Sequence, residues 1–268
     1  METIIFDGKK IANQKLKELK ERVSKIKLKG KLVSIIAGEN ERNLVYAKLK
    51  KEAAQKIGLA VEIKDLGEKT SYKEIKELIQ NLNENKDVAG IMLQLPLSDS
   101  LKSKTFMLIH LIQPEKDLDG MRDDSCYLAP VIKGVMEIVK ISGLKSSHNP
   151  KVVVLGNRGF VGKKIVEELV RNNFSPQGLD LETKDLRKET IKADLLITAC
   201  NQSGIVTKEM VKDGVVVIDV SSPKGDAKSK ELIGKASFVS PVPGGVGPLT
   251  IFYLLENLVE KLEGNLIQ

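Results

Sequence analysis

The sequence predicts an α/β protein of two domains with a cleft between them. Apolar strand patterns alternate with amphipathic helix patterns along most of the 268 residues, which is typical of parallel sheets covered by helices. A glycine-rich turn at 156–162 joins one strand pattern to the next helix pattern. A second unusual run, 240–250, holds three prolines and three glycines and precedes the last helix pattern.

The composition narrows the class of protein. Hydrophobic residues make up 41% and charged residues 29%, so the chain can bury a core. No apolar run approaches the ~20 residues that cross a bilayer, and the N-terminus lacks the pattern of a signal peptide. We therefore expect a cytoplasmic protein that does not bind membranes.

Few residues are available for metal or histidine chemistry. Cys126 and Cys200 are too few for a disulfide framework, and no His/Cys spacing fits zinc, so no metal is expected. His110 and His148 are the only histidines, so we do not expect a mechanism built on histidine.

The net charge is +7, and much of the excess lies in 9–31. A nucleic-acid face is one interpretation. A solvated helix face is favoured, because glutamates interleave with the lysines and no aromatic residues accompany them. We therefore expect no nucleic-acid partner, and a basic surface also suits an anionic small substrate.

The first half of the chain shows three strand–helix alternations. Helix patterns cover Lys9–Ile26, Glu41–Ile57 and Tyr72–Leu82, and strand patterns cover Lys31–Ala37, Leu59–Leu66 and Val88–Leu95. Gly58 is placed to stop the second helix, Ser71 to cap the third, and Pro96 to end the third strand.

The second half repeats the alternation. Helix patterns cover Lys133–Ile141, Lys163–Asn172 and Leu249–Leu262, and strand candidates cover Lys151–Leu155, Gly178–Leu181, Asp194–Ala199 and Val215–Val220. The polar stretch 221–235 is expected to be a loop.

The turn Gly156-x-x-Gly159-x-x-Gly162 follows a strand and precedes a helix. That context is typical of a loop that lets a pyrophosphate approach a helix N-terminus. Arg158 stands where the usual motif has its second glycine, so a plain strand–helix turn remains an alternative.

Tyr46 and Lys50 lie four residues apart and share one helix face. A lysine beside a buried stripe can have a lowered pKa and act as acid or base, although a surface lysine is commoner. Gln94 ends an apolar strand, where α/β proteins bind ligands.

Two further stretches allow two interpretations each. Asp117 and Asp119 lie in 114–120, which favours a turn, or a carboxylate that binds an amine-rich ring. The run 240–250 is either a linker or a stiff ligand wall at a domain junction.

Four segments together resemble the bifunctional methylenetetrahydrofolate dehydrogenase/methenyltetrahydrofolate cyclohydrolase family, the FolD family. They are Tyr46-x-x-x-Lys50, Gly90-Ile-Met-Leu-Gln-Leu-Pro-Leu97, Pro114-Glu-Lys-Asp-Leu-Asp-Gly120 and Pro241-Val-Pro-Gly-Gly-Val-Gly-Pro-Leu-Thr250. The resemblance implies an oxidoreductase and hydrolase of one-carbon metabolism, serving purine biosynthesis. It also implies a homodimer.

The resemblance implies roles for the folate site. Lys50 would be the acid/base of the hydrolysis, Gln94 would hold it, Tyr46 would stack on the aminobenzoyl ring, and Asp119 would bind the pterin. These four residues are the expected catalytic set. The substrate-binding set shares Tyr46, Gln94 and Asp119 and adds Leu95, Pro96, Pro243, Gly244 and Gly245.

The resemblance also implies a nicotinamide cofactor, held by Gly156, Asn157, Arg158, Gly159, Val161, Gly162, Asp180 and Ser222. NADP is expected, with Arg158 on its phosphate. NAD is the alternative, because Asp180 and Glu182 flank the place where the family has a serine.

The implied division assigns 1–120 and 248–268 to an N-terminal α/β catalytic, folate-binding domain, and 121–247 to a Rossmann-like dinucleotide-binding domain. Because the cofactor loop departs from the family pattern, two other functions stay open. The protein could be mainly a cyclohydrolase, or a folate- or nucleotide-binding protein with impaired dehydrogenase activity.

Overall fold

The computed structural model describes residues 2–27, 29–38 and 41–264, apart from the side chain of Arg42. The chain divides into two compact units. One, here the three-stranded unit, comprises Gln14–Pro130 and Ile251–Gln268, and the other, the six-stranded unit, comprises Met1–Asn13 and Val131–Thr250. Within the described ranges, no helix has the length and apolar character to cross a membrane.

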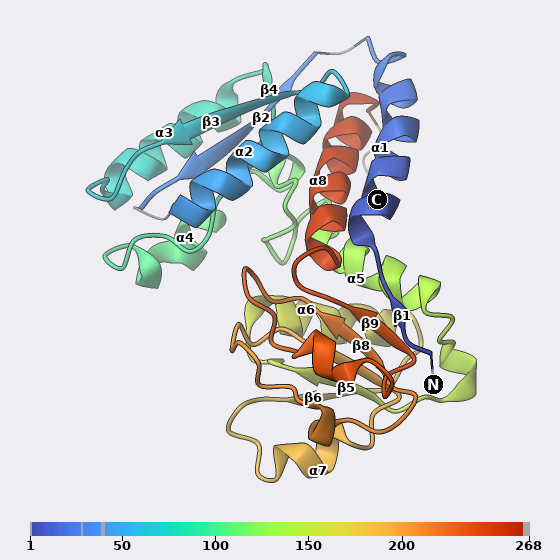
Figure 1. Ribbon diagram of the computed structural model, residues 1–268. Helices are drawn as coiled ribbons and strands as arrows, with labels where there is room; N and C mark the ends of the chain where they lie inside the picture. The colour runs from blue at the N-terminus through green and yellow to red at the C-terminus, as the bar shows by residue number, and fades with distance from the viewer. Residues whose placement is uncertain (1, 28, 39–40, 265–268) are drawn as a thin grey trace. The chain divides into compact units, whose positions relative to one another are not determined.

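The three-stranded unit is built on a parallel sheet in the order β3-β2-β4. Its strands are β2 (Lys31–Ile36), β3 (Ala60–Asp65) and β4 (Val88–Leu93), connected by the helices α2 (Glu41–Lys56) and α3 (Tyr72–Glu84) (Figure 1). The chain crosses from β2 outward to β3 and then back to β4. Right-handed crossovers in opposite directions put their helices on opposite faces of the sheet.

The two faces of β2 are covered by different side chains. Val33 and Ile35 pack with Ile75 and Ile79 of α3 in one buried cluster. Alternate residues of a strand point to opposite faces, so Ser34 lies on the other face. The expected cap of α3 is confirmed: the hydroxyl of Ser71 accepts from the N–H of Glu74, whose carboxylate accepts from the N–H of Ser71.

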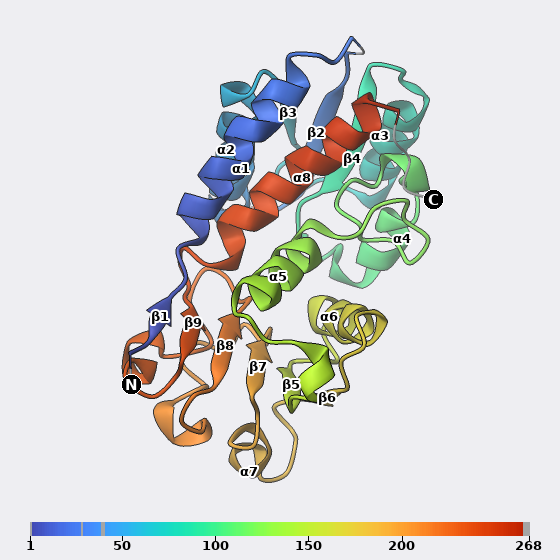
Figure 2. The ribbon, with the colours of Figure 1, turned by 90° about the vertical axis from the view of Figure 1, so that its right-hand side faces the viewer.

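Two long helices, α1 (Gly8–Val23) and α8 (Val246–Leu262), lie side by side in both ribbon views (Figures 1 and 2). Arg22 pairs with Glu263 at 2.7 Å, and the ammonium of Lys15 lies over the rings of Phe252 and Tyr253. The division between the units falls inside both helices. The shorter segments of the three-stranded unit are η1 (Lys102–Lys104), α4 (Thr105–Ile109) and η2 (Pro114–Lys116).

The six-stranded unit holds an all-parallel sheet in the order β1-β9-β8-β7-β5-β6. Its strands are β1 (Ile4–Ile5), β5 (Val152–Leu155), β6 (Pro176–Leu179), β7 (Leu195–Thr198), β8 (Val216–Asp219) and β9 (Phe238–Ser240). Its helices are α5 (Pro130–Ile141), α6 (Phe160–Arg171) and α7 (Leu186–Thr190), with short turns η3 (Ser146–His148), η4 (Lys208–Met210) and η5 (Ser229–Leu232). From β5 the chain continues to β6 on one side of it and later to β7 on its other side. The switch point of the sheet therefore lies between β5 and β7.

The structure confirms the α/β class and corrects some elements. The edge strand β1 and its partner β9 carry no strand pattern long enough to recognise, because they have two and three residues. The strand expected at 178–181 lies two residues earlier, as β6, since its polar and glycine residues carry little period-two signal. The N-terminal residues enter this unit because Ile4 and Ile5 pair with β9.

Candidate active site

The polar residues expected at the site, Lys50 and Gln94, lie where β2 and β4 end. These neighbouring strands form the switch point of the small sheet, which is where ligands bind in such folds. Gln94 directly follows β4, and its N–H donates to the carbonyl of Ile35 at 2.8 Å. This bond extends the β2–β4 ladder by one residue and fixes the backbone from which the Gln94 side chain leaves.

Lys50 of α2 reaches into this switch point. Its ammonium nitrogen donates to the side-chain oxygen of Gln94 at 3.0 Å and to the sulfur of Met92 at 3.4 Å. Met92 and Gln94 lie on one face of the strand because they are two residues apart. The Lys50 side chain is therefore aimed at β4 and is only 4% exposed.

Burial lowers the pKa of Lys50 from its usual value to about 8, and the negative charge of Asp119 acts in the opposite direction. A neutral amide and a thioether compensate an ammonium poorly for lost water. An amine with this pKa exchanges protons readily near neutral pH.

Tyr46 lies one turn before Lys50 on α2. The ammonium of Lys50 sits 4.7 Å from the centre of its ring, which is within range of a cation–π contact. Asn43, one turn earlier, is buried and donates from its amide to the carbonyl of Pro96 at 2.9 Å. The segment with Leu95 and Pro96 is thereby fastened to the helix that carries Lys50.

The charged residues of the segment 114–120 differ in their contacts. Lys116 is buried, and its ammonium donates to the carbonyls of Leu82, Asn83 and Asn85 at 2.9, 2.7 and 2.9 Å. These carbonyls belong to the C-terminal end of α3, which has no further helical partners to offer them. Lys116 is thus a helix cap in the three-stranded unit.

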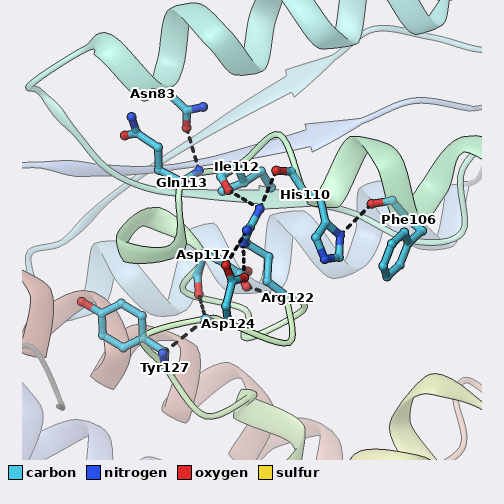
Figure 3. A network of polar contacts seen from close by, with 10 residues as sticks. Asn83, Phe106, His110, Ile112, Gln113, Asp117, Arg122, Asp124 and Tyr127 are labelled. Atoms are coloured by element: carbon cyan, nitrogen blue, oxygen red, sulfur yellow. Dashed lines mark hydrogen bonds and ion pairs between the residues drawn. The ribbon is translucent and has the colours of Figure 1, made fainter.

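Asp117 is likewise structural and belongs to a network around Arg122 (Figure 3). Its carboxylate accepts from the N–H of Arg122 at 2.8 Å. The guanidinium of Arg122 holds both oxygens of Asp124 at 2.7 Å and donates to the carbonyls of Ile112 and His110. The loop that contains Asp119 is consequently held by side chains on its other positions.

Asp119 is the acid of this segment whose charge acts on Lys50. Burial is the main cause that raises its pKa, and the positive charge of Lys50 opposes this. Leu118 beside it is fully buried against Gly90 of β4, where any side chain on Gly90 would overlap it. The amide of Asn257, in α8, donates to the carbonyl of Leu118 at 2.8 Å.

Gly120 closes the turn after Asp119. Its φ is +62°, and a Cβ there would come within 2.5 Å of the nitrogen of Ala129. Only glycine fits both conditions.

The six-stranded unit holds a tight turn at its own switch point. Gly156 has φ of +93°, and a Cβ on it would lie 2.7 Å from the carbonyl oxygen of Ala199, which follows β7. A Cβ on Gly162, in the first turn of α6, would overlap the carbonyl of Gly156. The chain therefore turns tightly into α6, and the N-terminus of a helix favours an anion.

The neighbours of this turn are also placed. Gly159 is the N-cap of α6 and Val161 lies in its first turn. The side-chain oxygen of Asn157 is buried and accepts no hydrogen bond from the described residues, so it is an acceptor in need of a donor. These features fit a dinucleotide whose phosphates face the helix and whose polar groups satisfy the turn.

Arg158 is bound to two acids. Its N–H donates to Asp180 at 3.2 Å, its Nε lies 3.2 Å from the other oxygen of that carboxylate, and a terminal nitrogen lies 2.7 Å from Glu182. Asp180 directly follows β6, the strand after β5 in the chain. The sequence predicts that Arg158 contacts the phosphate of NADP, whereas in the structure its guanidinium lies against Asp180 and Glu182.

The loops after β7 and β8 are tied by two fully buried carboxylates. Asp226 accepts from the Thr198 hydroxyl and from the N–H groups of Cys200 and Gln202, at 2.6–2.8 Å. Asp219 binds Ser221 and accepts from the N–H of Ala227 at 2.8 Å.

Ser222, expected at the cofactor, is exposed at the tip of the loop after β8. Its N–H donates to the side-chain oxygen of Asn201 at 3.1 Å. Ser222 is thereby tied to the loop after β7, next to the switch point of the large sheet.

The run 240–250 is a closed turn into α8. The N–H of Gly245 donates to the carbonyl of Pro241 at 2.8 Å, and the N–H of Gly8 donates to the carbonyl of Gly244 at 2.8 Å. Gly244 has φ of +102°, and Pro243 at the tip is exposed and follows a cis peptide bond. The expected Pro243, Gly244 and Gly245 thus form one turn of the six-stranded unit.

The expected site residues form two groups. Tyr46, Lys50, Gln94, Leu95, Pro96 and Asp119 belong to the three-stranded unit, and the glycine turn, Asp180, Ser222 and the 243–245 turn belong to the six-stranded unit. Met92 and Asn257 were not identified as site residues from the sequence. Met92 lies two residues before Gln94, so strand geometry alone could have placed both on one face, and a lone amide in an apolar helix could have identified Asn257. No cluster of three potential metal ligands occurs within residues 2–27, 29–38 and 41–264.

Two family models together match most of the chain. The catalytic-domain model of tetrahydrofolate dehydrogenase/cyclohydrolase matches residues 6–119, and the NAD(P)-binding-domain model of the same enzymes matches residues 129–266. The bifunctional protein FolD of Staphylococcus carnosus is 35% identical, over 98% of both chains.

Solved structures agree. The bifunctional enzyme FolD from Campylobacter jejuni is 31% identical with a TM-score of 0.90, covering 98% of this chain and 100% of its own. The methylenetetrahydrofolate dehydrogenase-cyclohydrolase of Trypanosoma brucei, complexed with NADP and an inhibitor, is 26% identical with a TM-score of 0.90, and 98% of each chain is covered.

Proposed function

The chain belongs to the tetrahydrofolate dehydrogenase/cyclohydrolase family, and we propose how its own residues carry the two reactions of that family. The protein is a bifunctional enzyme of folate one-carbon metabolism. It oxidises 5,10-methylenetetrahydrofolate and hydrolyses 5,10-methenyltetrahydrofolate, and it takes a nicotinamide dinucleotide. The observation that carries the proposal is the buried Lys50 bonded to Gln94.

Lys50 manages the protons of the hydrolysis. Water attacks the methenyl carbon, and the neutral amine takes a proton from it. The bond from that carbon to N5 then breaks, N5 receives a proton from the resulting ammonium, and the second water proton leaves to solvent. The lowered pKa of about 8 supplies neutral amine at physiological pH.

Three residues position the folate around Lys50. Gln94 accepts from the amine and fixes its direction. Tyr46 offers its ring to the aminobenzoyl group. Asp119, whose loop is locked by Asn257, binds the amino and ring N–H groups of the pterin. Leu95 and Pro96 line the same strand end. That Pro243, Gly244 and Gly245 offer bare backbone to the substrate stays a prediction from the resemblance.

The glycine turn 156–162 would hold the dinucleotide, because the N-terminus of a helix such as α6 favours phosphates. A bound nicotinamide would supply the acceptor for the hydride that leaves the methylene bridge. Residues 1–120 with 248–268 would form the folate-binding part, and 121–247 the dinucleotide-binding part. The expectation of NADP depends on Arg158 reaching a 2′-phosphate.

The cellular setting of the enzyme is a further part of the proposal. We infer a homodimer in the cytoplasm, with 10-formyltetrahydrofolate supplied to purine biosynthesis. Sedimentation of the purified protein tests the dimer, and labelling of purines in cells that lack the gene tests the pathway.

The experiment for the two activities is a pair of assays. Purified protein should reduce NAD or NADP with 5,10-methylenetetrahydrofolate, and should hydrolyse 5,10-methenyltetrahydrofolate without any dinucleotide. Lys50→Ala should abolish the hydrolysis, and retained hydrolysis would refute the role of Lys50.

A further inference from the structure

Asp180 occupies the position that recognises the adenosine ribose in dinucleotide-binding folds. It follows β6, and it comes about 20 residues after the glycine turn that follows β5, the preceding strand. An acid at this place accepts from the ribose 2′-hydroxyl of NAD, whereas an arginine there accommodates the 2′-phosphate of NADP. This chain has both an acid and an arginine here, so the contacts of these two residues decide which cofactor the site favours.

The carboxylate of Asp180 is fixed. Its side chain is 19% exposed, one oxygen accepts from the N–H of Arg158 at 3.2 Å, and the other lies 3.2 Å from the Nε of Arg158. The backbone is also held, since its N–H donates to the Thr183 hydroxyl and the N–H of Thr183 donates back to its carbonyl. Asp180 therefore cannot turn away from an incoming ribose without losing these bonds.

The guanidinium of Arg158 is already matched by acids. Asp180 holds its Nε, and Glu182 holds a terminal nitrogen at 2.7 Å. Two carboxylates against one guanidinium leave this cluster negative. A doubly charged 2′-phosphate would enter it against repulsion, whereas a 2′-hydroxyl would find an acceptor.

The neighbouring lysines do not neutralise the negative charge of this cluster. Lys163 lies 3.8 Å from Glu167, and Lys164 lies over the ring of Phe160. Lys184 is exposed and stands in the chain between Glu182 and Asp185, so that 180–185 holds three acids and one lysine.

We propose that Asp180, with Arg158 and Glu182 held against it, makes this enzyme select NAD over NADP. The proposal rests on the proposed dehydrogenase function and assigns the cofactor of its site. The fixed part of the cluster is the carboxylate, and the arginine that would receive a 2′-phosphate is turned toward it.

The test compares NAD with NADP in the unaltered protein, in Asp180→Asn and in Asp185→Asn. The first substitution keeps the shape of the side chain and one acceptor oxygen but removes the charge. Asp185→Asn removes the same charge from the same loop, and asparagine tolerates its φ of +55°. For each protein, kcat/KM is measured for NAD and for NADP. The affinities for two probes, 5′-AMP and adenosine 2′,5′-bisphosphate, are both measured by calorimetry.

The unaltered protein should favour NAD at least tenfold and bind 5′-AMP more tightly than the bisphosphate. Asp180→Asn should shift both ratios toward the phosphorylated ligand at least tenfold, and Asp185→Asn less than threefold. A smaller preference for NAD, or equal shifts in the two variants, overturns the proposal. If neither dinucleotide supports oxidation, the dehydrogenase assignment fails instead, and the probe affinities still decide the choice. Hydrolysis of methenyltetrahydrofolate without dinucleotide checks the fold of each variant.

Discussion

The ammonium nitrogen of Lys50 lies 3.0 Å from the side-chain oxygen of Gln94. The two residues are 44 positions apart in the sequence. They meet because α2 packs across the sheet in which β4 lies beside β2. The contact gives a buried amine a direction and one good acceptor.

Replacing Gln94 in two ways should move the pH dependence of hydrolysis in opposite directions. Gln94→Leu removes the acceptor of the ammonium and should lower the pKa of Lys50 further, by roughly one unit for a bond to a charged group. Gln94→Glu adds a negative charge and should raise it. The measurement is the midpoint of the pH–rate profile. Shifts of the same sign in both variants would contradict the contact.

Lys50→Met should abolish hydrolysis and also change how stability depends on pH. In the unfolded chain Lys50 keeps its proton up to about 10.5, whereas in the folded protein it loses it near pH 8. The unfolded state therefore binds more protons between these values, so this lysine makes folding more favourable as pH rises.

Between pH 7.5 and 9.5 the free energy of unfolding of the unaltered protein should rise relative to Lys50→Met by about 2 kcal/mol. Urea unfolding at both pH values measures the difference. Parallel curves for the two proteins would show that Lys50 is not buried as described.

Lys116→Met should destabilise the protein without changing the chemistry. It leaves three carbonyls at the end of α3 without their donor, at a cost of about 3 kcal/mol or more. Lys73→Met, on the exposed face of α3, is the control and should cost less than about 0.5 kcal/mol. Denaturant midpoints give the stabilities. A change in the pH–rate midpoint of Lys116→Met would instead place this lysine in the chemistry.

Gly162→Ala should separate the two activities. Its Cβ would overlap the carbonyl of Gly156, so the turn must open and dinucleotide binding should weaken at least tenfold. Gly159→Ala, whose Cβ would lie 3.2 Å from the same oxygen, should weaken it less. Hydrolysis without dinucleotide should persist in both, because Lys50 and Gln94 belong to the other unit. Equal effects of the two alanines on the KM for the dinucleotide would contradict this account.

Much of the architecture was predictable because its signals are local. The strands β2 and β4 are short, mostly apolar runs, α3 has a helical period, and Ser71 with Glu74 marks a helix start within four residues. The pair of two- and three-residue strands β1 and β9 was not predictable. Their pairing joins positions near opposite ends of the chain, and neither carries a pattern of its own.

The sequence by itself determined the α/β class, the two-part organisation and the resemblance to the family, since residue type and spacing along the chain define these. Only the tertiary structure decided what each charged residue of those segments does. In 114–120, Lys116 caps the helix α3, and the carboxylate of Asp117 accepts from the N–H of Arg122. Asp119 instead interacts with the charge of Lys50. At the glycine turn it binds Arg158 to Asp180 and Glu182. The physical reason is that charge and hydrogen bonding act over a few ångströms in space, and the partners of these groups lie many residues away in the chain.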